Sequence, residues 1–226
     1  MSHAALLVLA DGRFPAGGHA HSGGVEAAVA SRGVHDAASL EAFCRGRLHT
    51  AGLTAAGLAA AAATGYDPMA LDEAADARTP TPVPALRQVA RKLGRQMLRA
   101  ARAAWPCPEL DQIAHRLPQG AHQPVVLGVA ARAAGLTPSD AAQCAAYESI
   151  SGPATAAVRL LSLNPFDATA LLARLAGELD DVAATAAEAA ARLATDGVGV
   201  LPAASSPLLD ITGEQHAAWP MRLFAS

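Results

Sequence analysis

Residues Leu9–Glu26 read LADGRFPAGGHAHSGGVE, the least interchangeable run in a chain otherwise rich in alanine and leucine. Five glycines and one proline give this run too much backbone freedom for a helix, and it has too few β-branched residues for a strand. Leucines precede it and an amphipathic pattern follows it, so we predict an ordered turn between two helices. Its side chains suited to specific polar contacts are Asp11, Arg13, His19, His21 and Ser22.

The end of this stretch is typical of a helix start. Ser22 is predicted to cap the following helix. Glu26 then lies in the first turn, where a negative charge interacts favourably with the helix dipole. We expect this short helix to extend to Ser31 and to end at Gly33.

The remaining composition predicts an all-helical protein. Alanine and leucine dominate, aromatic residues make up only 4%, and alternating valine and isoleucine are nearly absent, which disfavours strands. A chain of 226 residues can bury one sizeable core. We predict a single domain over residues 1–226, a multi-helix bundle with an N-terminal helix and glycine-rich loop in 1–22 and an irregular tail in 197–226. The proline-rich segment Thr79–Pro84 is interpreted as a rigid linker within that domain.

Charge, cysteines and hydropathy indicate a cytoplasmic protein. The formal net charge of −3 argues against a chain built globally for nucleic acid. Cys44, Cys107 and Cys144 contain no C-x-x-C pair and are read as reduced thiols. The N-terminus lacks the positive region of a signal peptide. The longest run without Asp, Glu, Lys or Arg, Leu48–Tyr66, is too short and too rich in alanine, threonine and glycine for the roughly 20 apolar residues of a membrane span.

Three long stretches show the apolar spacing of helices. One runs from Ala37 to Thr64 and contains Gly52 and Gly57. Each glycine costs about 1 kcal/mol relative to alanine in a helix, so we expect both to permit close helix packing. The other two stretches are Ala85–Ala104 and Asp167–Thr195.

Two features interrupt helical periodicity later in the chain. A helix that begins at Thr137 should kink or break at Pro153, which has no N–H to donate. In the tail we expect at most one short helix, starting near Thr212. The tail carries more apolar side chains than an irregular segment can bury, which indicates a partner: Leu208, Leu209, Ile211, Trp219, Leu223 and Phe224.

The helix Ala85–Ala104 has a basic face without any acidic residue. This stripe is either a solvated helix face or a docking surface for an acidic partner or nucleic acid. Its residues are Arg87, Arg91, Lys92, Arg95, Arg99 and Arg102.

Motifs for chemistry are sparse. His19-x-His21 resembles part of a metal site, with Asp11 or Glu26 as a supporting acid, but two histidines do not complete one. The glycines are not followed by Gly-Lys-Ser/Thr, and no G-x-S-x-G elbow is present. The sequence therefore predicts no enzyme and no tightly bound cofactor, and His21 is read as a side chain that fixes the loop.

Several blocks resemble the UreF family of urease accessory proteins. The family's D-x-x-F-P-x-G and H-S-x-G-x-E elements match the loop, where the matching residues are Asp11, Phe14, Pro15, Gly17, His21, Ser22, Gly24 and Glu26. Further matches occur in the family's order: His122-x-Pro-Val-Val-x-Gly128, Tyr147 and Ser151 before Ala156-Ala-Val-Arg-Leu160, and His216 before Arg222-Leu-Phe-x-Ser226. Two departures are His19, where the family usually has an aromatic residue, and Asn164-Pro165, where Leu-Gly is common.

This resemblance implies an all-helical homodimer that is not an enzyme. UreF proteins join UreD (also called UreH) and the GTPase UreG in delivering nickel to apo-urease, with nickel at most in transit through the chain. The resemblance implies that the tail docks on UreD/UreH, and our candidates there are Arg222, Leu223 and Phe224. For the UreG or dimer face we choose Tyr147 and Arg159, since an arginine in an apolar helix needs a carboxylate or carbonyl partner.

Two other classes of function stay open from sequence. A nickel carrier would use His19 and His21. A helical DNA-binding regulator would use the stripe Arg87–Arg102, although no helix-turn-helix with a basic recognition helix is evident.

Overall fold

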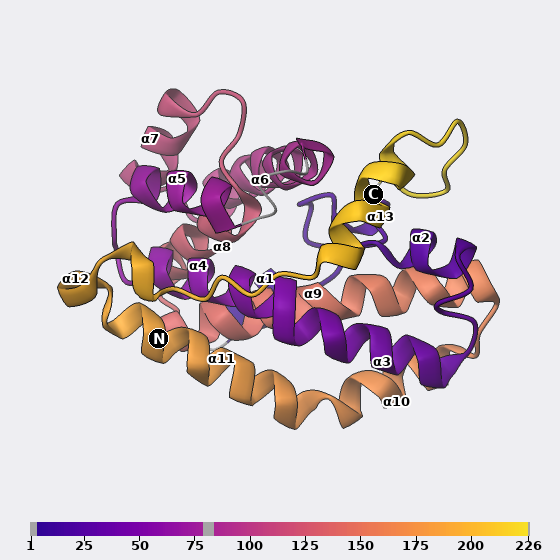
Figure 1. Ribbon diagram of the computed structural model, residues 1–226. Coiled ribbons are helices and arrows are strands. Elements are labelled where there is room, and N and C mark those ends of the chain that lie inside the picture. The colour runs from indigo at the N-terminus through magenta and orange to yellow at the C-terminus, as the bar shows by residue number, and fades with distance from the viewer. Residues whose placement is uncertain (1–3, 79–83, 226) are drawn as a thin grey trace.

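The structure is a computed structural model that describes residues 4–78 and 84–225, and these residues form helices and no strand. The prediction of an all-α, multi-helix fold is confirmed (Figure 1). No helix in the described ranges combines the length and the apolar character needed to cross a bilayer. The α-helices are α1 (Ala4–Ala10), α2 (Val25–Ala30), α3 (Ala37–Arg47), α4 (Leu53–Ala63), α5 (Pro68–Arg78), α6 (Pro84–Ala104), α7 (Pro108–Arg116), α8 (Gln123–Ala133), α9 (Pro138–Leu161), α10 (Pro165–Arg174), α11 (Ala176–Ala191), α12 (Leu193–Asp196) and α13 (Pro207–Ala217).

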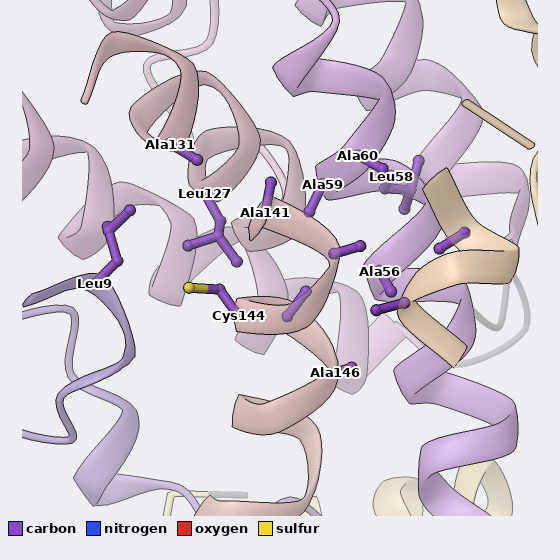
Figure 2. Close-up of a cluster of buried hydrophobic side chains, with 14 of the residues drawn as sticks. Leu9, Ala56, Leu58, Ala59, Ala60, Leu127, Ala131, Ala141, Cys144 and Ala146 are labelled. Carbon is purple, nitrogen blue, oxygen red and sulfur yellow. The ribbon is translucent and has the colours of Figure 1, made fainter. Parts of the chain in front are cut away.

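Helix α4 lies at the centre of the core. Its residues from Ala56 to Ala63 are all buried, as expected for a helix that is apolar all round. Helices α8, α9 and α11 pack directly against it. Most of the contacting side chains are small, so the helix backbones approach closely. Figure 2 shows one cluster of this core, with Leu9, Ala56, Leu58, Ala59, Ala60, Leu127, Ala131, Ala141, Cys144 and Ala146 labelled.

Two glycines permit the closest helix contacts. A β-carbon at Gly128 of α8 would overlap the carbonyl oxygen of Ala59 in α4 and lie 2.6 Å from the β-carbon of Ala62. At Gly94 of α6 it would overlap the carbonyl oxygen of Ala121, just before α8. Glycine at these positions therefore sets the spacing between α4, α8 and α6.

The predicted helix from Ala37 to Thr64 is interrupted. A π-helical turn, Leu48–Gly52, separates α3 from α4. The expectation for Gly52 is confirmed, because a β-carbon there would lie 2.6 Å from the Ser149 hydroxyl oxygen of α9. Gly57 accommodates Pro202 of the C-terminal segment and not another helix, since its β-carbon would lie 2.6 Å from Pro202 Cδ. That contact joins residues too distant in sequence for local pattern to reveal.

We predicted a kink or a break at Pro153, and no break occurs, because α9 continues through this residue to Leu161. Pro153 is buried and packs against the glycine-rich loop, where a β-carbon at Gly23 would lie 2.9 Å from Pro153 Cγ. Tertiary packing thus offsets the lost backbone hydrogen bond. The predicted single helix Asp167–Thr195 is divided in the structure into α10, α11 and α12. There the fully buried Leu175 forms a corner, so that α10 packs on α3 and α9 while α11 packs on α4 and α9.

The predicted linker Thr79–Pro84 lies mostly outside the described residues, since only its Pro84 is described, as the first residue of α6. Whether the chain folds as a single domain stays a prediction.

Candidate functional site

The glycine-rich loop packs against α6. Phe14 stacks on Trp105 at the end of α6, with the ring centroids 6.0 Å apart. Asp11 fixes the start of the loop by accepting a hydrogen bond from the Arg13 N–H at 2.9 Å and by pairing with the Arg13 guanidinium. Gly17 has a positive φ of 81°, and a β-carbon there would overlap the Gln96 side chain of α6. Pro15, also predicted to shape the loop, is exposed.

The loop ends at a buried carboxylate that binds the tail of the same chain. Glu26 is 7% exposed and accepts hydrogen bonds from the backbone N–H groups of Leu223 (2.8 Å) and Phe224 (3.1 Å). Its other contact is with His216 Nε2 at 2.9 Å. Nearby, the Ala225 N–H donates to the Ala20 carbonyl at 2.8 Å. We call this set of contacts the tail latch.

Glu26 lies in the first turn of α2, and its charge state follows from the latch. The predicted cap, Ser22, accepts from the Glu26 N–H at 3.3 Å, while Gly24, with φ 89°, occupies the N-cap position. Burial raises the pKa of Glu26, but the N–H donors of Leu223 and Phe224 and the imidazole of His216 outweigh it, so the pKa lies below its ordinary value. Glu26 is therefore a carboxylate when the tail is docked.

The tail is more regular than predicted. Its helix, α13, begins at Pro207 and not near Thr212, because proline suits the first helical position, where an N–H is not needed. Helix α13 is attached to α6, where Glu214 accepts from the Ala85 N–H at 2.7 Å, and to α2 through the latch. Figure 1 shows α13 (yellow) between these two helices.

The structure separates the three predicted tail contacts. Phe224 is buried, at 6% exposed, whereas Leu223 is 77% exposed and Arg222 is exposed. Arg159 of α9 lies over the Phe224 ring, 5.3 Å from its centroid. We expected a carboxylate or carbonyl partner for Arg159, but none is present among the described residues. Such a partner is not required, because the guanidinium is exposed, can stay hydrated and interacts with an aromatic face. Tyr147, on the same helix, is 36% exposed.

A cavity of about 860 Å³ joins most of these residues, and we call it the α9 groove. Helix α9 contributes Tyr147 and Arg159, α6 contributes Val89, α13 contributes Leu209, and the loop contributes His21. The other predicted site residues along it are Asp11, Phe14, His19, Arg222 and Phe224. Segments from both ends of the chain thus form one surface feature.

Two titratable groups in the groove have strongly shifted pKa values. Burial lowers the pKa of His21 to about 4, assisted by the positive charges of Lys92 and His19, so His21 is neutral at physiological pH. Burial raises the pKa of Glu148 to about 7, although the Gln123 amide donates to it at 2.6 Å. Glu148 is half-buried. Sequence reasoning missed it as a groove residue, since nothing local shows that it lines a cavity.

Glu148→Gln is expected to stabilise the protein at pH 8. A folded-state pKa of about 7, against an ordinary 4.5, means that this carboxyl costs stability as pH rises from 4.5 to 7, with the full cost above that range. The variant should gain about 3 kcal/mol at pH 8 and less than half of that at pH 5. Urea unfolding at both pH values measures the gain. Glu73→Gln, at an exposed position of α5, serves as the control, and an equal gain in both variants would contradict the assignment.

The histidines of the loop do not assemble a metal site. His19 is exposed and His21 is buried. In the described part of the chain, no group of three or more His, Cys, Asp or Glu side chains is placed to hold a metal ion.

Part of the basic stripe is used inside the protein. Arg91 pairs with Asp72 at 2.9 Å and Asp76 at 2.8 Å, both in α5, and also donates to the Gly120 carbonyl. The buried His122 completes the cluster. Its backbone N–H donates to Asp72, and its ring Nε2 is hydrogen-bonded to Asp76 at 2.8 Å. Arg102 and Arg95 also have partners, Asp111 and the Gln119 carbonyl respectively.

These features define an all-helical protein whose terminal segments meet at a surface groove. Residues 34–176, more than half of the chain, match the family model described as UreF. The chain is 44% identical to the urease accessory protein UreF of Mycolicibacterium vanbaalenii over 100% of this chain and 99% of that protein. The UreF proteins of Mycobacterium marinum (42% identical, 99% and 98% covered) and Mycobacterium tuberculosis (38% identical, 100% and 99% covered) are similar over their full lengths.

The chain therefore belongs to the UreF family of urease accessory proteins. The predicted resemblance is confirmed, and so is the prediction that the chain is not an enzyme, because the family consists of accessory proteins.

Proposed function

We propose that this chain joins UreD/UreH and the GTPase UreG in a complex that delivers nickel to apo-urease. It acts as a homodimer in the cytoplasm, and nickel at most passes through it. Family membership supports the accessory role. The observation that carries the scaffold function is an exposed apolar surface on an ordered tail.

This tail surface consists of four side chains that point away from the protein. Leu208 and Ile211 of α13 are 72% and 58% exposed, and Met221 and Leu223 beyond it are 85% and 77% exposed. Large exposed apolar groups that gather on one segment mark an interaction site. Our sequence prediction was an irregular tail that orders on its partner, but the described tail is already docked on its own chain. Docking in advance reduces the entropy lost on binding.

The latch divides the tail residues into two roles. Phe224 anchors the tail inside the protein, and Leu223, its neighbour in sequence, faces outward. We propose Leu223 and Arg222 as contacts with UreD/UreH, and Phe224 as the residue that positions them. Tyr147 and Arg159, exposed on α9, remain our candidates for the UreG or dimer face.

The test is co-expression with UreD/UreH and UreG, followed by size-exclusion chromatography with light scattering. Ile211→Asp combined with Leu223→Asp should abolish the complex while leaving the chain folded. Phe166→Asp is the matched control, because Phe166 is 80% exposed on α10. A complex that survives the double substitution, or one that Phe166→Asp disrupts equally, would refute the tail surface. Surface substitutions are preferable to truncation after Pro207, which would also deprive Glu26 of its donors.

The two alternative functions, a nickel carrier and a DNA-binding regulator, gain no specific support. The nickel carrier lacks further ligands beside His19 and His21 among the described residues. The DNA-binding class requires a free basic stripe, yet Arg91 and Arg102 form ion pairs within the protein.

A further inference from the structure

The α9 groove has the dimensions and lining of a site for an extended peptide. Its volume is about 860 Å³, and α13, attached to α6 and α2, forms part of its wall. Apolar side chains predominate along its walls, and pockets that bind ligands are typically of this kind. They include Leu58, Leu86, Val89, Leu93 and Leu209.

Five cations line this groove without a carboxylate partner among the described residues: Arg47, Arg78, Lys92, Arg159 and Arg222. By contrast, Arg45, Arg91, Arg102, Arg132 and Arg174 each pair with an Asp or Glu. The Arg47 side chain donates from its Nε to the Ser149 carbonyl at 2.8 Å. Burial lowers the pKa of this guanidinium, so the charge lies where desolvation disfavours it. A carboxylate from a ligand would offset that cost.

The carboxylates of the groove do not balance these cations. Asp11 pairs with Arg13, and Glu148, with a pKa of about 7, is partly neutral at physiological pH. Burial raises the pKa of Asp210. The groove is therefore locally positive although the formal charge of the chain is −3. A concave site with apolar walls concentrates such a potential.

We propose that the α9 groove binds an acidic peptide segment that carries apolar side chains. Carboxylates of the peptide meet Arg47, Lys92 and Arg159, and its apolar side chains meet the walls from α6 and α13. A continuous polyanion such as DNA fits less well, because its phosphates would leave the apolar walls of the groove without apolar partners. The inference rests on the proposed function only in taking a protein as the partner.

The experiment selects peptides from a random dodecapeptide display library on the full chain. We expect enrichment of peptides with net negative charge and large apolar residues. An enriched peptide, made synthetically with a fluorophore, should bind the native chain and lose roughly tenfold or more in affinity with Lys92→Glu or Arg159→Glu. Arg99→Glu is the matched control, since Arg99 is exposed on α6, lies outside the groove and has no described ion pair.

Each outcome decides the proposal. Failure to enrich acidic peptides, or equal affinity of the native chain and a correctly folded Lys92→Glu variant, overturns it. Competition by duplex DNA for the same site would replace the peptide with nucleic acid and also overturn it. The Ile211→Asp, Leu223→Asp chain should still bind the peptide, because its substitutions lie outside the groove. Loss of the accessory complex with peptide binding retained would thus separate the tail surface from the groove.

Discussion

Gly128→Ala is expected to lower the free energy of unfolding by about 3 kcal/mol, the upper end of the range for overpacked cores. The added methyl group overlaps the Ala59 carbonyl oxygen and lies 2.6 Å from the Ala62 β-carbon. A backbone carbonyl cannot rotate out of the way as a side chain can. Helices α4 and α8 must therefore move apart, which opens gaps along the centre of the core. Urea unfolding followed by circular dichroism measures the loss.

Two other glycines provide controls for this effect. A β-carbon at Gly46 of α3 or Gly177 of α11 would have no heavy atom within 4 Å. Alanine at either position should stabilise the protein by up to about 1 kcal/mol, because alanine is the better helix former. If Gly128→Ala behaved like these two variants, the close packing of α4 on α8 would be wrong. Gly94→Ala should resemble Gly128→Ala, because it overlaps the Ala121 carbonyl oxygen.

Glu26→Ala is expected to release the C-terminal tail and to destabilise the chain by about 3 kcal/mol, the scale for removing one partner from a buried charged network. The substitution leaves the Leu223 and Phe224 N–H groups and His216 without their acceptor. The Phe224 ring should then leave its place beneath Arg159. Trypsin cleavage after Arg222 should become faster, and Trp219 fluorescence should change, since Trp219 packs on His216 with ring centroids 4.7 Å apart.

The control for the latch is Glu73→Ala on the exposed face of α5, which should leave tail cleavage unchanged. Glu26→Gln retains one acceptor oxygen and should fall between the native chain and Glu26→Ala. Because the folded-state pKa of Glu26 is depressed, its stabilisation is complete above the ordinary value of 4.5 and disappears as pH falls through the folded pKa. Native-like tail protection in Glu26→Ala would show that the latch does not hold the tail.

The latch connects these experiments to the proposed function. Glu26 orders the segment that presents Leu223 and Met221, so its loss should weaken the accessory complex without touching the tail surface itself. A weakened complex in Glu26→Gln, together with an intact groove, would indicate that the latch positions the tail for its partner.

Local sequence signals were sufficient for the fold class and for many helix ends. The helix start predicted at Thr137 is confirmed, because Thr137 is the N-cap of α9 and its N–H donates to the Asp140 carboxylate at 2.8 Å. The stretch Ala85–Ala104 forms α6, within one residue of the prediction. The glycine-rich loop and the terminal R-L-F-x-S motif were sufficient to indicate the family. These features depend on residues only a few positions apart, where propensity, capping and backbone freedom act.

The candidate site depended on tertiary structure. Glu26 and His216 are 190 residues apart in the chain, and no local pattern pairs them. Burial of Glu148, the ion pairs of Arg91 and the path of α9 through Pro153 likewise depend on which helices become neighbours. The sequence by itself determined that the chain is helical, where its loop lies and which family it belongs to. Only the fold decided which carboxylate holds the tail and which cations line the groove, because burial and long-range pairing arise when helices pack and are not properties of a segment alone.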